Sequence, residues 1–181
     1  MSYLRSLPAD ATLRHVFQSR PETSAPLLDL HERLLRGPSP FTVAERELMA
    51  AYVSGLNACA YCHGIHTATA EAFGVPAGLL TDALKDLETA PVEARLKPVL
   101  RYLDVLTRTP ALLTPGHAEA VYAAGWDEHA LHDAVMVGAL FNLMNRMVEG
   151  LGITADPAWF PVSADHLHRH GYTGLTTPPA T

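Results

Sequence analysis

The feature that most restricts the fold is a long apolar run near the end of the chain, EHALHDAVMVGALFNLMNRMVEGLG, which directly follows Asp127. Aspartate is a favoured N-cap, so the run predicts a long helix. From Val135 to Val148 this helix has almost no polar face, and such a helix must be covered on nearly all sides. We therefore expect its own chain or another copy to cover it, and the apolar band predicts a homo-oligomer.

The signals that start and stop secondary structure are helical elsewhere too. TVAE at 42–45 is a capping box formed by Thr42 and Glu45, and it predicts a helix over 43–56. A second helix is predicted with Asn57 as its possible N-cap and Gly74 at its end. Proline, threonine and glycine signals predict further helices from Pro76, around Pro98 and between Thr114 and Gly125. Because no stretch alternates with a period of two, the predicted fold class is all-α, with seven to nine helices.

Length, charge and the N-terminal sequence narrow the functional classes. The 181 residues suit one domain, and 48% of them are hydrophobic. A net charge of -6 without any Lys/Arg cluster argues against a nucleic-acid partner. Neither a signal-peptide pattern nor an uncharged stretch of bilayer length is present, so we expect a cytoplasmic protein without membrane contact. The segment HLHRH at 166–170 is interpreted as an exposed amphipathic end rather than a metal site.

The segment NACAYCHGIH at 57–66 holds both cysteines of the chain. On a helix, Cys59, Cys62, His63 and His66 stand at i, i+3, i+4 and i+7 and share one face. Zinc is a poor match, because ligands from two turns of one helix cannot surround an ion tetrahedrally. C-x-x-C-H is also the attachment pattern of c-type haem, with His63 as axial ligand, but that attachment accompanies export. We therefore expect neither a metal nor a cofactor.

Thiol chemistry fits this segment better. A helix N-terminus and a neighbouring imidazole both lower a thiol pKa, and His66 lies at i+4 from Cys62, within reach as a base. Two cysteines three residues apart can close a disulfide after one has been oxidised. The competing interpretation is that both are small buried apolar residues. In the long helix, three polar residues either line a pocket, bond across an interface or are ordinary core polar groups: Asn142, Asn145 and Arg146.

Read from Glu47 onwards, the residues form the pattern E-x11-C-x2-C-x3-H, with Cys59, Cys62 and His66 in the other fixed places. This pattern resembles the AhpD-like alkylhydroperoxidase branch of the carboxymuconolactone decarboxylase superfamily. The long helix is similar to the one that ends the core domain of its peroxidase-related group. The resemblance covers about residues 25–155 and implies an AhpD-like helical core there, between extensions at 1–24 and 156–181.

The resemblance also implies a function, a cofactor-free and oligomeric thiol peroxidase acting on small hydroperoxides. Cys62 then attacks the peroxide, Cys59 is its disulfide partner, and Glu47 with His66 forms a proton relay. A lipoyl-bearing or thioredoxin-like protein is the implied reductant. From the residues alone the nucleophile stays open, because an N-cap at Asn57 favours Cys59 whereas His66 favours Cys62; we prefer Cys62.

Two other functions are compatible with the sequence. A redox-responsive or scaffold protein could keep the fold and the oxidisable pair without rapid turnover. A cofactor-free lyase of the decarboxylase branch would act on a lactone and keep its activity without the thiols. The role of His63 is also open, and Tyr61 is interpreted as a lid or packing residue.

Overall fold

The computed structural model describes residues 2–154, 156–173 and 175, and this part of the chain contains helices and no strand. The prediction of an all-α fold is therefore confirmed. The elements in chain order are α1 (Leu13–Ser19), α2 (Pro21–Arg36), α3 (Val43–Leu56), α4 (Ala60–Ala72), α5 (Leu79–Lys85), α6 (Lys97–Arg108), η1 (Pro110–Leu112), α7 (Pro115–Ala123), α8 (Glu128–Gly150), η2 (Pro157–Trp159) and α9 (Phe160–His170).

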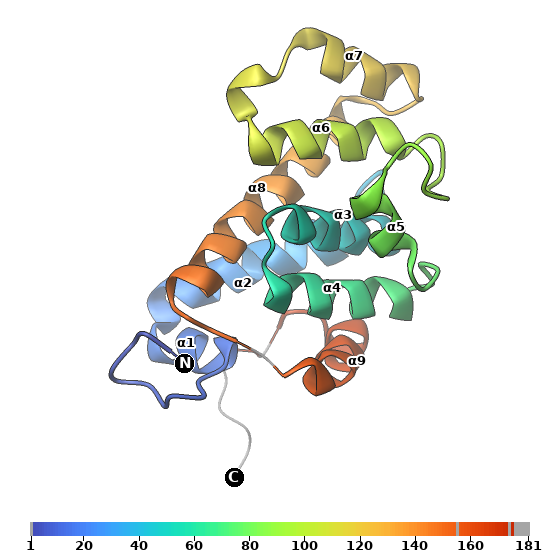
Figure 1. The fold of residues 1–181 in the computed structure, drawn as a ribbon. Coiled ribbons are helices and arrows are strands. Elements are labelled where there is room, and N and C mark those ends of the chain that lie inside the picture. Colours follow the sequence, from blue (N-terminus) through green and yellow to red (C-terminus); the bar gives the residue numbers. More distant parts are fainter. Residues whose placement is uncertain (1, 155, 174, 176–181) are drawn as a thin grey trace.

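Helices α3, α4 and α8 form the centre of the molecule. Helix α4 packs between α3 and α9, while α8 packs against α2, α3 and α6. Figure 1 shows α6 and α7 at one end of the molecule and α1 and α9 at the other. Helices α1 and α9, which lie outside the predicted core, are thus at the same end of the molecule.

Helix α3 begins where the capping box predicts. Thr42 Oγ1 accepts a hydrogen bond from the Glu45 backbone N–H at 3.2 Å, and Glu45 Oε2 accepts one from the Thr42 N–H at 2.7 Å. Both contacts satisfy N–H groups that a helix start leaves without partners. The bounds predicted for this helix, 43–56, are confirmed.

The predicted start of the next helix is wrong by two residues. Asn57 caps the C-terminus of α3, and Cys59 is the N-cap of α4. Between them Ala58 has a φ of 54°, a left-handed conformation that ends α3. The Asn57 amide group instead donates to Asn142 and Asn145 of α8, and this long-range bonding fixes its orientation. The first cysteine therefore lies at the start of the helix rather than within its first turn.

Two helices begin near a proline, but at other positions than the sequence predicts. Helix α5 begins at Leu79 and not at Pro76, because Gly78 before it has a φ of 83°. The helix expected around Pro98 does not continue across that residue from the N-terminal side. It begins at Lys97, so the proline occupies the first turn, where its missing N–H leaves no helical bond unmade.

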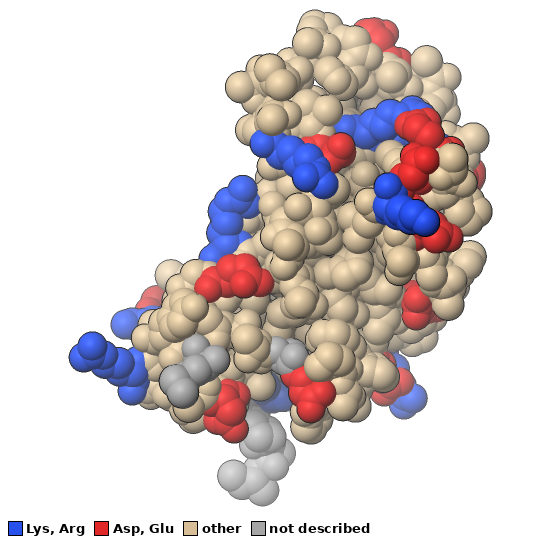
Figure 2. All heavy atoms as spheres, in the orientation of Figure 1, with Lys and Arg blue, Asp and Glu red and all other residues tan. Residues whose placement is uncertain are grey.

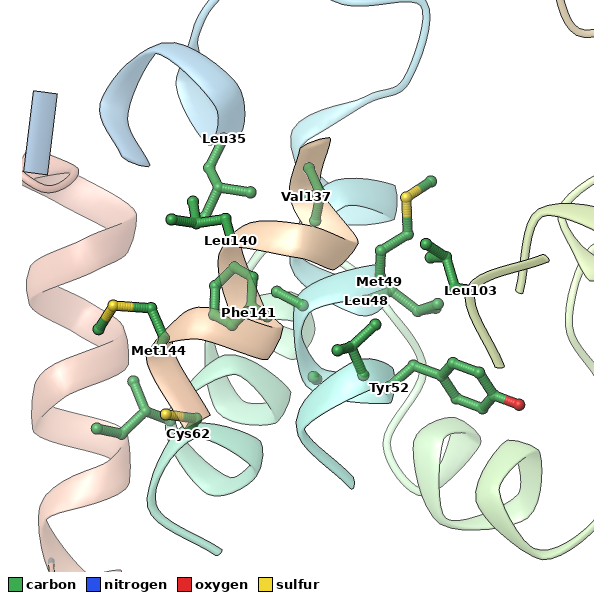
Figure 3. Packing of buried hydrophobic residues seen from close by; sticks show 14 of the residues in the cluster. Leu35, Leu48, Met49, Tyr52, Cys62, Leu103, Val137, Leu140, Phe141 and Met144 are labelled. Atoms are coloured by element: carbon green, nitrogen blue, oxygen red, sulfur yellow. The ribbon is translucent and has the colours of Figure 1, made fainter. Parts of the chain in front are cut away.

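Helix α8 begins as predicted, since the Asp127 side chain accepts a hydrogen bond from the Ala130 N–H at 2.8 Å. Its inner side is buried, with Val137 and Phe141 in the core shown in Figure 3. The described residues leave its other side uncovered, where Ala139 is exposed and Leu143 is 50% exposed. On the face drawn in Figure 2, a broad area over α3 and α4 carries no charged side chain. Within the described residues, no helix combines the length and apolarity needed to cross a bilayer.

Self-association through the outer side of α8 is our expectation from this exposure. Light scattering should give a mass above the 19.6 kDa of one chain, and Leu143→Lys should shift it toward that value. Leu112→Lys is the matched control, because Leu112 is 65% exposed but lies on η1. A mass of one chain at all micromolar concentrations of the unmodified protein would contradict the prediction.

The approach of α9 to α4 depends on Gly64. A Cβ atom at this position would overlap the ring of Phe160, the first residue of α9. We expect Gly64→Ala to lower the free energy of unfolding by about 1–3 kcal/mol, because the ring must move out of a packed position. Chemical denaturation measures this change. Gly150→Ala is the control, since a Cβ there meets nothing within 4 Å, and an equal loss in both variants would show that packing against Phe160 is unimportant.

Candidate active site

Glu47 on α3 is the centre of a buried polar network. Its side chain is fully buried, and three donors from three other segments reach its carboxylate. His66 Nδ1 lies 2.6 Å from Oε2, Arg36 Nη1 lies 2.7 Å from Oε1, and the Tyr172 hydroxyl donates to Oε1 at 3.0 Å. A buried carboxylate needs such partners, because an unpaired charge inside a protein is strongly destabilising.

The network keeps Glu47 ionised. Burial acts to raise its pKa, but the contacts with His66 and Arg36 outweigh burial and leave the pKa of Glu47 below its ordinary value. Because the carboxylate only accepts hydrogen bonds, the proton of this contact is on His66 Nδ1. Nε2 is therefore the His66 nitrogen left for exchange with a substrate. Burial and the nearby carboxylate raise the pKa of Tyr172 well above its usual value, so it stays a hydroxyl donor.

The two cysteines are both free thiols at the start of α4. Cys59 has no exposed surface and Cys62 is 3% exposed. A hydrogen bond from the Cys62 side chain lowers the pKa of Cys59, and the Cys62 backbone N–H adds to this effect. The same sulfur contact, together with burial, raises the pKa of Cys62. In the reduced pair, the hydrogen bond from Cys62 thus favours the thiolate form of Cys59.

A cavity of about 740 Å³ lies beside this pair. Cys62 and His66 line it, and Figure 3 places Cys62 at the margin of the apolar core, near Met144 of α8. Cys59 is absent from the described residues that form the wall. The rest of the wall is largely apolar and includes Phe17 of α1, Leu28 of α2, Phe141 of α8 and Leu167 of α9. A ligand of ordinary organic size fits this volume, and it would meet Cys62 first.

The predicted set Glu47, Cys59, Cys62 and His66 is thus brought together by α3 and α4. The hydrogen bond found for the His66 ring joins it to Glu47, and His66 shares with Cys62 the wall of the cavity. The catalytic roles of these four residues stay predictions. Asn145 of α8 completes the surroundings of Cys62, since its side chain hydrogen-bonds this thiol and acts to lower the Cys62 pKa.

The other residues named from the sequence make hydrogen bonds within the protein or line the cavity. His63 Nδ1 lies 2.9 Å from the Ala51 carbonyl oxygen and so ties α4 to α3. Asn145 donates to Ser54 Oγ at 3.0 Å, and Arg146 Nη1 donates to the Asn142 carbonyl oxygen at 2.7 Å. Tyr61 lines the cavity, and burial raises its pKa to about 12.

The histidines of HLHRH lie on α9, where His168 and His170 are exposed. His166 of the same segment reaches the cavity wall. The described part of the chain contains no group of three or more histidine, cysteine, aspartate or glutamate side chains placed to hold a metal ion.

Sequence reasoning missed three residues of the site, namely His31, Arg36 and Tyr172. Arg36 and Tyr172 complete the hydrogen bonds of Glu47, and His31 lines the cavity. Tyr172 is separated from Glu47 by 125 positions, and no local spacing pattern joins them. A buried carboxylate on α3 was the one available signal, because it requires donors from elsewhere in the chain.

The hydrogen bond from Cys62 to Cys59 gives a prediction for the pH dependence of thiol reactivity. Because the pKa of Cys59 is lowered, its thiolate should form at a pH below the ordinary thiol pKa. The thiolate fraction should then increase as the pH rises. Cys62→Ala removes the sulfur that donates to Cys59, so the remaining thiol should titrate at higher pH. Thiolate absorbance against pH measures both values. Equal titration midpoints for Cys59 in the two proteins would contradict this assignment.

Comparison with known proteins agrees with the observed fold. Residues 21–104 match the family model described as the carboxymuconolactone decarboxylase family. No curated protein gives a significant match. The chain is similar in structure to an uncharacterised peroxidase-related protein from Silicibacter sp. TM1040, with a TM-score of 0.76 and 22% identity over 82% of this chain and 78% of that chain.

Two further solved structures have the same fold. An uncharacterised peroxidase-related protein from Ralstonia eutropha JMP134, described as an alkylhydroperoxidase AhpD core, has a TM-score of 0.75 and 20% identity over 82% of this chain and 78% of its own. A cysteine-to-alanine variant of the debrominase Bmp8, in complex with 2,3,4-tribromopyrrole, has a TM-score of 0.71 and 14% identity over 85% of this chain and 81% of its own.

Proposed function

Because the chain belongs to the AhpD-like and carboxymuconolactone decarboxylase superfamily, we propose that it is a thiol-dependent peroxidase acting on hydroperoxides. The observation that carries this proposal is that the two thiols have different positions, one in the cavity wall and one behind it. Cys62 lines a cavity together with His66, which Glu47 holds by a short hydrogen bond, and Cys59 lies behind Cys62 within sulfur contact. Such an arrangement suits a thiol that reacts and a second thiol that resolves.

The proposed reaction uses only groups of this chain and the hydroperoxide. Cys62 passes its proton to Cys59, and its thiolate attacks the terminal oxygen of ROOH. The O–O bond breaks, Cys62 becomes a sulfenic acid, and the alkoxide leaves with both electrons of that bond. Protonated His66, stabilised by Glu47, gives the alkoxide its proton. Cys59 then displaces water from Cys62 and closes the disulfide, so the dithiol supplies both electrons and no metal or cofactor is needed.

Steady-state consumption of a hydroperoxide in the presence of a dithiol donor tests the proposal. Dihydrolipoamide and reduced thioredoxin represent the two reductant classes that we propose, and the Cys59→Ser, Cys62→Ser double variant is the control. Continued turnover that the control lacks supports the enzyme. A single stoichiometric oxidation favours the alternative of a redox-responsive or scaffold protein. Activity on a lactone that survives in the double variant favours the cofactor-free lyase.

A second candidate reaction is reductive dehalogenation, favoured by the likeness to the debrominase Bmp8 and by the largely apolar cavity beside the thiols. In this reaction an organic bromide and the dithiol give the debrominated product, bromide, a proton and the disulfide. Release of bromide from 2,3,4-tribromopyrrole by the reduced protein tests it. Peroxide turnover without bromide release would favour the peroxidase over the dehalogenase.

A cytoplasmic location, the 1–24 and 156–181 extensions and the homo-oligomer belong to the same proposal. The cytoplasm is kept reducing, which suits a protein whose two cysteines are free thiols.

A further inference from the structure

The cavity beside Cys62 is lined by two buried imidazoles. His66 belongs to the motif, whereas His31 comes from α2 and is 2% exposed. The His31 ring lies edge-on to Phe141 with centroids 6.0 Å apart and tilted against Tyr172 at 5.2 Å. The His66 ring contacts the same two aromatic rings, at 4.5 Å and 6.4 Å. The two histidines therefore form part of one wall, and shared aromatic rings fix their positions.

The hydrogen bond of His31 determines which of its nitrogens faces a ligand. Nδ1 lies 2.7 Å from the carbonyl oxygen of Leu27, one turn earlier on α2. A carbonyl oxygen only accepts, so Nδ1 carries the proton of this bond. Nε2 then has a lone pair in the neutral ring, and no hydrogen bond to it occurs within the described residues. The free nitrogen of His31 is thus a hydrogen-bond acceptor in the cavity wall.

His31 and His66 have hydrogen-bond partners of different charge. The carboxylate of Glu47 compensates a positive charge on His66, whereas the partner of His31 is a neutral carbonyl group. Burial, and after it the nearby His66, lower the pKa of His31 to about 4, although its Leu27 hydrogen bond and Glu47 act in the opposite direction. At neutral pH His31 therefore stays uncharged, and its Nε2 remains an acceptor while His66 can act as the acid.

We propose that His31 Nε2 accepts a hydrogen bond from the terminal O–H of a bound hydroperoxide and so positions that oxygen in front of Cys62. The inference rests on the proposed function for its chemistry and adds a substrate-positioning residue outside the four-residue motif. The proton stays on the terminal oxygen throughout, because that O–H group moves to Cys62 as the sulfenic acid. The alkoxide left behind is protonated by His66, so the two imidazoles have separate roles.

Two substitutions separate positioning from structural support. His31→Asn can keep an N–H donor to the Leu27 carbonyl but removes every atom at the place of Nε2. His31→Gln reaches the place of Nε2 with an amide oxygen that can accept, but it lacks the donor near the backbone. His63→Asn is the control, because His63 makes the same kind of bond to a backbone carbonyl and does not line the cavity. If His31 has only a structural role, His31→Asn should retain more ligand binding than His31→Gln. If His31 positions the substrate, His31→Gln should retain more.

Binding of an unreactive analogue tests the inference without peroxidase activity. The probes are 2-phenyl-2-propanol, the alcohol of cumene hydroperoxide, and its methyl ether, which has no O–H group. The unmodified protein and His63→Asn should bind the alcohol about tenfold more tightly than the ether. His31→Asn should lose this preference and His31→Gln should keep part of it. An unchanged preference in His31→Asn, or no preference or no binding in the unmodified protein, overturns the inference.

Rapid-mixing kinetics with cumene hydroperoxide separates this result from the proposed function. In His31→Asn the hydroperoxide concentration for half-maximal rate of the first oxidation should rise about tenfold, with a smaller change in the maximal rate. A reduced protein that binds the alcohol through His31 yet never reacts with the hydroperoxide would refute the peroxidase and leave the binding site. Equal kinetics in the His31→Asn and unmodified proteins would refute the role of His31 and leave the peroxidase.

Discussion

Reduced protein carrying Cys62→Ser is expected to show no rapid oxidation by a hydroperoxide, whereas the Cys59→Ser protein consumes one equivalent and then stops. Cys62 faces the cavity, and Cys59 has no exposed surface. Without Cys59 the sulfenic acid on Cys62 has no resolving thiol, so it should persist long enough to be trapped. Mass spectrometry after reaction with dimedone identifies the modified residue. The effect on the first step is expected to be complete loss in one variant and retention in the other.

The reverse pattern would give Cys59 the role of nucleophile. That outcome would mean that the negative charge placed on Cys59 at the start of α4 decides the reaction, rather than access from the cavity. His66→Ala is a further check on Cys62. It should slow the first oxidation by about 100-fold or more, since the alkoxide loses its acid, and leave the identity of the oxidised cysteine unchanged.

Glu47→Gln is expected to have the largest effect on stability, about 3–5 kcal/mol of the free energy of unfolding. The substitution preserves shape but removes the carboxylate that pairs with the partly buried Arg36 guanidinium, and it removes the negative charge beside His66. Chemical denaturation at neutral pH measures the loss, and the first oxidation should slow as well. Glu88→Gln is the control, since it breaks an exposed ion pair with Arg101 and should change stability little.

The pH dependence of stability gives a second measure of the same carboxylate. Its pKa is lower in the folded protein than in the unfolded chain, so its contribution is present above the ordinary glutamate pKa of about 4.3. The contribution is lost as the pH falls below that value, through the lower pKa of the folded state. The unmodified protein should therefore lose more stability than Glu47→Gln on acidification. Parallel curves for the two proteins would contradict a charged Glu47 in the folded state.

The sequence was sufficient for the parts of the site that depend on short spacings. A capping box fixed the start of α3, and the spacing of Glu47, Cys59, Cys62 and His66 identified residues that two consecutive helices bring together. Helix periodicity carries this information because neighbours on one face are three or four positions apart.

Other parts depend on contacts between distant segments, and local patterns do not contain them. Asn57 has a good N-cap side chain, but α8 holds its amide, so α4 begins at Cys59 instead. The donors Arg36 and Tyr172, and the acceptor His31, each come from a segment whose own sequence gives no sign of a site. The division between a cavity-facing and a covered cysteine also follows from tertiary packing alone.

The separation along the chain between the parts of the site has a consequence for protein synthesis. The contact of Glu47 with His66 closes a loop of 19 residues, whereas the contact of Glu47 with Tyr172 closes one of 125. Loop-closure entropy makes the second contact about 1.7 kcal/mol more costly to form, and α9 and Tyr172 also leave the ribosome after α3, α4 and α8. A nascent chain can therefore bring its two thiols and its histidine together before the walls of the cavity exist. During this interval the choice of oxidant depends on thiol chemistry alone, and selection by shape begins only when the C-terminal segment docks.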